Sequence, residues 1–82
     1  MKNKIAMIGI IVEDLSYAEI VNDIFHEHAP LILGRMGIPY KERGISIITL
    51  IIEGTEDEIS NLTYKLNKIP QITVKSIMPK KN

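Results

Sequence analysis

One stretch of this chain constrains its fold more than any other: a glycine-rich segment, residues 34–44, runs directly into an uncharged block, residues 45–52. The first segment combines glycines, one proline and a charged tip, which fits the arm and turn of a β-hairpin. The block that follows is eight residues long, mostly isoleucine, and apolar at both odd and even positions. Because successive side chains of a strand point to opposite faces, this strand must be covered on both faces.

Composition predicts one folded domain spanning residues 1–82. A chain of 82 residues is near the lower end of what a single core can stabilise. Its hydrophobic content of 45% is too high for a disordered chain, and its charged content of 24% is ordinary for a globular one. The absence of cysteine excludes disulfides, thiolate metal ligands and a cysteine nucleophile.

Charge and aromatic content argue against nucleic acids and membranes as partners. Ten basic and ten acidic residues balance, so no general field gathers polyanions or anionic lipid. The aromatic residues lie outside the expected inner strands, which excludes RNA binding by stacking on an open sheet. No segment approaches the roughly 20 apolar residues that span a bilayer, and the run at residues 5–12 ends without a signal cleavage site. We therefore expect a cytoplasmic protein with no direct nucleic-acid or membrane partner.

The hydrophobic pattern predicts six elements in the order β-α-β-β-α-β. Two capping-box spacings, Ser16 with Glu19 and Thr55 with Glu58, mark the expected helix starts. The first helix is expected to include Ile20 in its broad apolar face. The expected strands are 5–12, 31–38 (stopped by proline at position 39), 45–53 and 72–78, and the expected helices are 14–29 and 55–69.

An internal repeat supports a ferredoxin-like fold. Two side-by-side β-α-β halves place strands 5–12 and 45–53 in the centre of one sheet and the glycine- and proline-containing strands at its edges. The predicted fold class is therefore α+β, a ferredoxin-like βαββαβ sandwich whose four-stranded antiparallel sheet carries two helices on one face. Residues forty positions apart match as Ile8 with Ile48, Ile10 with Leu50, Ile11 with Ile51, Val12 with Ile52, Glu13 with Glu53, Pro30 with Pro70 and Pro39 with Pro79.

Two helices leave one face of such a sheet uncovered. Strand parity groups Ile45, Ile47 and Ile51 on one face, and Met7 and Ile11 on one face of the first strand. Monomers seldom expose apolar patches beyond roughly 300 to 600 Å². Covering ~600 Å² at about 25 cal/mol per Å² would contribute on the order of 15 kcal/mol as an upper bound, before the association entropy is subtracted. We expect these five residues to form the interface of a homo-oligomer, either a dimer or a tetramer.

Few residues in the chain suggest catalysis, a cofactor or a metal. Glu13 and Asp14 form an acidic pair after the first strand, but no nucleophile or histidine is adjacent, and acids at a helix start are stabilising in themselves. His26 and His28 point about 200° apart on a helix, which excludes a metal site within one helix and favours a role at its C-terminus. A metal site shared across a subunit interface stays open. We expect no enzyme activity, no cofactor and no metal held by a single chain.

Arg35 is the one cation in the expected second strand, residues 31–38. A guanidinium at this position could pair with a carboxylate of a partner subunit or with an anionic ligand. A surface ion pair within the chain is the simpler alternative.

The run at residues 34–48, with residues 9–14 before it and 62–66 after it, resembles the small proteins described as regulators of the iron-only hydrogenase system. That family is similar to ACT domains and to the C-terminal regulatory domain of nickel-responsive repressors, whose subunits associate through their sheets and hold effectors near the interfaces. The resemblance implies a regulatory module. By position it implies an effector site near the loop after the first strand, at Glu13, Asp14, Leu15 and Ser16.

Two departures limit what the resemblance carries over. The nickel site of those repressors includes a cysteine, which this chain lacks, so nickel sensing of that type is not expected. Only four residues precede the first expected strand, so we expect no DNA-binding segment and any transcriptional role would need a protein partner. Two functions remain open: an oligomeric regulator that binds a small-molecule effector, or an interaction and assembly module without such a ligand.

Overall fold

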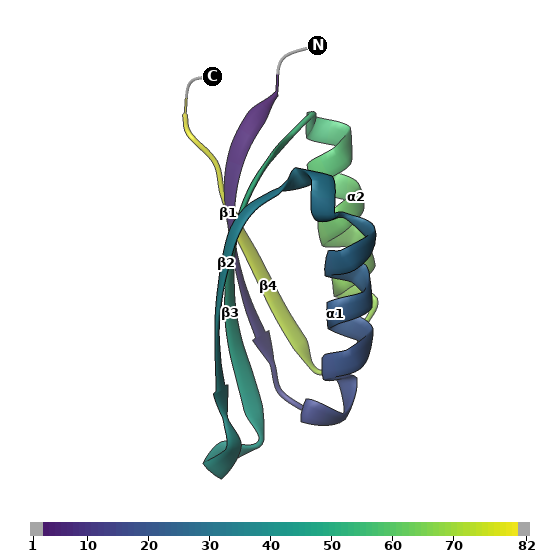
Figure 1. The fold of residues 1–82 in the computed structure, drawn as a ribbon, viewed down its shortest axis with the longest axis vertical. Helices are drawn as coiled ribbons and strands as arrows, with labels where there is room; N and C mark the ends of the chain where they lie inside the picture. The colour runs from purple at the N-terminus through teal and green to yellow at the C-terminus, as the bar shows by residue number, and fades with distance from the viewer. Residues whose placement is uncertain (1–2, 81–82) are drawn as a thin grey trace.

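The computed structural model describes residues 3–80 and confirms the predicted α+β, ferredoxin-like fold. Both helices lie on one side of a single sheet (Figure 1), and short 3-10 turns join several elements. No helix in residues 3–80 is long and apolar enough to cross a membrane. The elements are β1 (Lys4–Val12), α1 (Ala18–Glu27), β2 (Ile32–Tyr40), β3 (Ile45–Gly54), α2 (Glu56–Asn67) and β4 (Ile72–Ile77), with 3-10 turns at Leu15–Tyr17, Ala29–Leu31 and Lys41–Arg43.

The sheet order is β2-β3-β1-β4, and each neighbouring pair is antiparallel. The isoleucine-rich strands β1 and β3 are therefore central, as predicted, and the strands that contain or adjoin a proline, β2 and β4, are at the edges. Met7 pairs with Ile51 and Ile11 with Ile47 across the two central strands. In this register odd-numbered residues of β1 pair with odd-numbered residues of β3, so the odd-numbered side chains of both strands lie on the same face of the sheet.

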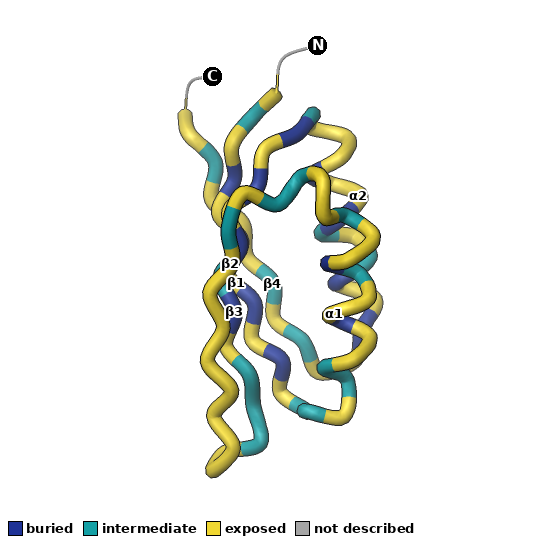
Figure 2. The backbone as a smooth tube through the Cα atoms, viewed as in Figure 1, coloured by how far each residue is buried: buried dark blue, intermediate teal, exposed yellow. Residues whose placement is uncertain are grey.

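The core lies between the helices and one face of the sheet. Burial alternates strictly along β1, as Figure 2 shows, because every second side chain faces the helices. The residue rows of α1 and α2 that face the sheet complete this layer. The core side chains are Ala6, Ile8, Ile10 and Val12 on β1, Ile48, Leu50 and Ile52 on β3, Val21 and Phe25 on α1, Ile59, Leu62 and Leu66 on α2, and Ile69 after it.

The second helix begins as the sequence predicts. Thr55 Oγ1 accepts a hydrogen bond from the Glu58 amide at 3.2 Å, and Glu58 Oε1 accepts one from the Thr55 amide at 2.8 Å. Each side chain thus satisfies a free amide of the first turn. The capping box at Thr55 is confirmed.

The start predicted for the first helix is wrong. Asp14 Oδ1 accepts hydrogen bonds from both the amide and the hydroxyl of Ser16, at 2.9 and 2.8 Å. The Ser16 hydroxyl is therefore used as a donor and caps no helix. Ser16 lies inside a 3-10 turn, Leu15–Tyr17, and α1 begins only at Ala18. The helix packs its Val21 row on the sheet, and Ile20, one residue earlier and about 100° around the axis, is 48% exposed rather than part of the apolar face.

The arm formed by β2 and β3 is longer than predicted. β2 continues through Pro39, which pairs with Ser46, to Tyr40. An edge strand tolerates proline because the missing N–H can face away from the sheet. Gly44 closes the turn at φ 68°, the left-handed conformation expected there. The hairpin end of the arm extends beyond the helices (Figure 1).

Candidate functional site

The face of the sheet opposite the helices carries most of the large apolar side chains that are exposed in the described residues. Its large side chains are 39% to 69% exposed, although they lie close together in register across all four strands. We call this set the open-face cluster. It consists of Ile5, Met7 and Ile11 on β1, Met36 and Ile38 on β2, Ile47 and Ile51 on β3, and Ile77 on β4.

Four of the five residues predicted at an interface belong to the open-face cluster: Met7, Ile11, Ile47 and Ile51. The fifth, Ile45, has the same parity but pairs with Tyr40 near the hairpin turn and is partly buried. The sequence missed Met36, Ile38 and Ile77 on the edge strands. The available signal for these residues was the same strand parity that was used for the central strands, but glycine and proline interrupt the apolar pattern on β2.

A hollow lies in the middle of this face, at Gly9. Gly9 sits opposite Thr49 on one side and Lys75 on the other, and Ile11 and Ile47 border the hollow, whose volume is about 280 Å³. A Cβ atom at position 9 would meet only the Lys75 carbonyl oxygen, at 3.9 Å. Because Gly9 has no side chain, the space above its backbone on this face stays unfilled.

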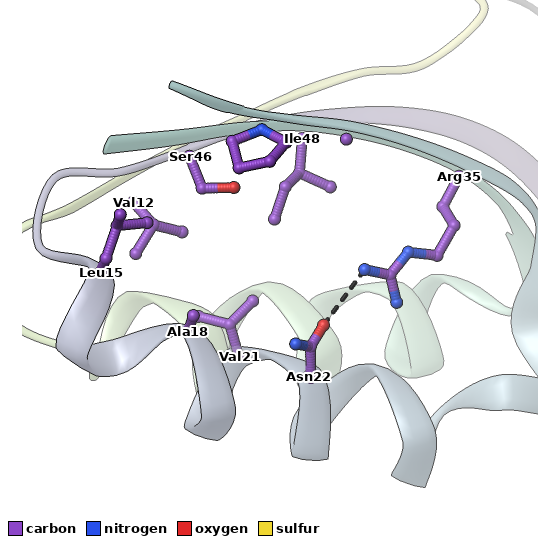
Figure 3. A pocket seen from close by; sticks show the side chains of 10 residues that line it. Val12, Leu15, Ala18, Val21, Asn22, Arg35, Ser46 and Ile48 are labelled. Atoms are coloured by element: carbon purple, nitrogen blue, oxygen red, sulfur yellow. Dashed lines mark hydrogen bonds between the residues drawn. The ribbon is translucent and has the colours of Figure 1, made fainter. Parts of the chain in front are cut away.

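A crevice lies on the helix side of the sheet, between α1 and the β2–β3 arm (Figure 3). Its volume is about 340 Å³, and its lining is mostly apolar. Three small residues, Ala18, Gly37 and Ser46, leave the space open. The other lining residues are Val12, Leu15, Val21, Asn22, Arg35, Pro39 and Ile48.

The guanidinium of Arg35 stands at one end of this crevice. Its Cζ lies 4.8 Å from the centroid of the Phe25 ring, and its Nη2 donates a hydrogen bond to Asn22 Oδ1 at 3.1 Å. Phe25 is only 2% exposed, so the cation rests on a ring fixed in the core. Within residues 3–80 Arg35 forms no ion pair with a carboxylate. The surface ion pair considered from the sequence is therefore replaced by stacking and an amide hydrogen bond.

The structure brings together only part of the predicted effector site. Leu15 and Arg35 both line the crevice, whereas Glu13, Asp14 and Ser16 do not. The Glu13 carboxylate accepts a hydrogen bond from the Thr73 hydroxyl at 3.2 Å, which directs it toward β4. The Ser16 amide, and then its hydroxyl, hold the pKa of Asp14 below its usual range. These three polar side chains are thus engaged locally.

Asn22 and Ser46 are polar lining residues that the sequence reasoning missed. Asn22 lies one position after the buried Val21, and Ser46 interrupts the isoleucine block. A polar residue inside an apolar pattern was the available signal in both cases. Only the tertiary fold places them beside Arg35.

His28 lies where α1 meets α2. It is partly buried, and its Nε2 has no hydrogen-bond partner among the described residues. Burial lowers the pKa of the imidazole below its usual value, the positive charge of Lys65 lowers it further, and Glu27 acts in the opposite direction. No group of three potential metal ligands occurs in the described part of the chain. A metal site shared between subunits stays an open alternative.

The lowered pKa of His28 predicts a pH effect on stability. Because the unfolded chain binds a proton at this site more readily than the folded one, the stabilisation is present above the unfolded pKa near 6.5 and is lost as the pH falls through the folded value. Urea unfolding of His28→Gln should show a flatter pH dependence than the wild type below that pH. The matched control is His26→Gln on the exposed side of α1, which should keep the wild-type slope. Equal slopes for His28→Gln and wild type would contradict this assignment.

The β-α-β-β-α-β order, with an open apolar sheet face behind the helices, defines a ferredoxin-like α+β domain. Residues 4–76 match the family described as "TM1266-like: Iron-only hydrogenase system regulator, putative", and the chain belongs to this family. The family resemblance read from the sequence is confirmed.

Solved structures agree with this assignment. The uncharacterized protein TM1266 from Thermotoga maritima is 32% identical, with a TM-score of 0.89 over 96% of this chain and 100% of that one. CPII from Thiomonas intermedia K12, a nitrogen regulatory PII-like protein, has a TM-score of 0.55 at 13% identity, covering 94% of this chain and 96% of its own. The divalent ion tolerance protein CutA1 from Ehrlichia chaffeensis has a TM-score of 0.52 at 14% identity, covering 100% and 87%. The last two show a shared fold alone, and a search of curated proteins found no match.

Proposed function

We propose that this protein is a non-enzymatic regulatory module that works as a homo-oligomer, joined through the open-face cluster, and responds to a small-molecule effector. The observation that carries the proposal is the uncovered apolar face of the sheet. Membership of the hydrogenase-regulator family supports a regulatory role. An unrelated partner protein on the same face is the competing function.

The area of the open-face cluster favours a stable interface. Eight large apolar side chains exposed over a continuous sheet face exceed the patch of roughly 300 to 600 Å² that monomers expose. They approach the ~800 Å² that each partner contributes to a standard interface. Leaving such a surface in water would make the isolated subunit prone to association.

The charges on this face favour a second copy over a partner of one charge sign. By register, Lys75 lies opposite Gly9 and Glu53 opposite Ile5, so the face carries charges of both signs. Two copies in a two-fold arrangement can place these opposite charges near one another. A strongly acidic or basic partner would leave one of them unpaired.

Sedimentation of the wild-type protein at micromolar concentration tests the proposal directly. A dimer or tetramer is expected. A stable monomer that is captured by one other protein would overturn self-assembly and leave the interaction module.

The hollow at Gly9 gives a second prediction. If a partner side chain occupies it, Gly9→Leu should weaken self-association by roughly 5- to 100-fold, because overpacking an interface costs about 1–3 kcal/mol. Gly9→Ala, which adds one carbon with only an ordinary contact, should have a much smaller effect. Both variants should fold, since side chains are favourable in strands. Dissociation constants from sedimentation equilibrium rank self-association of the wild type and the two variants. A Gly9→Leu variant that associates as tightly as the wild type would place the interface elsewhere.

A further inference from the structure

We infer that the crevice between α1 and the β2–β3 arm binds a small aliphatic monocarboxylate, with its carboxylate on the Arg35 guanidinium. This inference names the class of effector for the regulator proposed above. The biological purpose of the binding rests on that proposal. The binding itself depends only on the crevice. Four features of the lining carry the inference.

The first feature is the charge of the crevice. Arg35 is its one cation, and no acidic side chain lines it. A single negative charge balances this cation, whereas a dianion such as phosphate would leave a net charge in a mostly apolar setting. The ligand that fits is therefore a monoanion.

The second feature is the donor geometry. A guanidinium has five N–H donors, and the hydrogen bond to Asn22 Oδ1 uses only one of them. The ring of Phe25 holds the group in place, so little side-chain entropy is lost when it binds. A carboxylate matches two adjacent donors of this planar fork. Figure 3 shows the guanidinium between the sheet and α1, at the end of the crevice.

The third feature is a shortage of acceptors, which argues against a free amino acid. Asn22 Oδ1 already accepts from Arg35, so the amide of Asn22 has its NH₂ left to donate. Ser46 adds a hydroxyl. An α-ammonium group would find no carboxylate in the lining, and its charge would add to that of Arg35. The crevice therefore favours an acid without an amino group.

The fourth feature is size. A volume of about 340 Å³ is at the lower end of the range, roughly 300 to 1,000 Å³, that holds small ligands. The floor residues Val12 and Val21 are almost fully buried, so the ligand would lie shallowly against the partly exposed Leu15 and Ala18. A short branched chain suits this space better than a nucleotide.

Titration of the full chain with small probes, followed by NMR, tests the inference. 3-Methylbutanoate is expected to shift the signals of Gly37, Ser46 and the Asn22 side-chain amide. Its neutral amide, 3-methylbutanamide, should bind at least ~10-fold more weakly, because it lacks the charge-assisted hydrogen bonds. Leucine and inorganic phosphate should also bind more weakly. Equal or tighter binding of any of these three would overturn the assignment.

Variants separate the site from its surroundings. Arg35→Gln should weaken 3-methylbutanoate binding at least ~10-fold, and Arg35→Lys should fall between this variant and the wild type because it keeps the charge but loses the fork. Arg43→Gln, an exposed arginine at the hairpin tip, is the matched control and should bind as the wild type does. Unchanged affinity in a folded Arg35→Gln would overturn the inference.

The two proposals can fail separately because the crevice and the open-face cluster lie on opposite sides of the sheet. A monomeric wild type that binds 3-methylbutanoate through Arg35 would keep this inference and overturn self-assembly. An oligomer that binds none of the probes would do the reverse.

Discussion

Ile47→Lys is expected to convert the proposed homo-oligomer into a folded monomer. Ile47 pairs with Ile11 on β1 and with Ile38 on β2, so it lies in the middle of the open-face cluster. It is 41% exposed in one subunit and would be covered by a second copy. Burying an unpaired ammonium group there would cost about 3 kcal/mol or more, which weakens association by ~100-fold or more. Sedimentation equilibrium gives the change in the dissociation constant.

Ile20→Lys is the matched control. Ile20 is exposed to a similar extent, 48%, but it lies on α1, on the opposite side of the sheet. This variant should keep the oligomeric state of the wild type, and the circular dichroism of both variants should match it. Equal dissociation in the two variants, or none in Ile47→Lys, would mean that the open-face cluster is not the interface.

The fold could be predicted from the sequence because its signals are local. Eight consecutive uncharged residues at 45–52 and the uninterrupted apolar run at 5–12 identify the central strands without reference to the rest of the chain. The capping box at Thr55 uses side chains three residues apart. The start of α1 was mispredicted because Asp14 and Ser16 could each cap a helix, and pattern alone does not show that the carboxylate would take the serine as its donor.

The candidate site was predicted only in part, because it is assembled by tertiary contacts. Arg35 stood out as the one cation of β2, but the ring on which it rests, Phe25, belongs to α1. The direction of the Arg35 side chain depends on which face of the edge strand it occupies. Asn22 and Ser46 join it only when the helix lies over the arm. The acidic pair after β1 was placed by analogy, and local hydrogen bonds engage it elsewhere.

Substitutions of apolar residues are expected to have different effects on the two faces of the sheet. On the helix side the core residues are fully covered, so substitutions there act on folding. On the other side the residues are exposed in the single chain, and we propose that a second copy covers them, so substitutions there are expected to act on assembly. Ile59, on α2, belongs to the core and not to the open-face cluster, so a substitution there tests folding separately from assembly.

Ile59→Ala is expected to cost about 2–5 kcal/mol of unfolding free energy, a large share of the 5–15 kcal/mol typical of small domains. Ile59 is only 4% exposed, in the layer between α2 and the sheet, so truncation leaves a cavity that close packing cannot fill. Urea unfolding at one fixed protein concentration gives the shift in midpoint, since association also changes apparent stability.

Ile20→Ala removes the same atoms from the exposed side of α1 and is the control for this measurement. Both substitutions place alanine in a helix, so the gain in helix propensity is similar and the difference between them reports burial. Ile20→Ala should change the unfolding free energy by less than about 1 kcal/mol, because truncating this exposed side chain removes few contacts from the packed core. Neither residue belongs to the open-face cluster, so both variants should assemble once folded. Similar midpoints for the two variants would contradict the placement of Ile59 in the core, whereas loss of assembly in a folded Ile20→Ala would contradict the placement of the interface on the far side of the sheet.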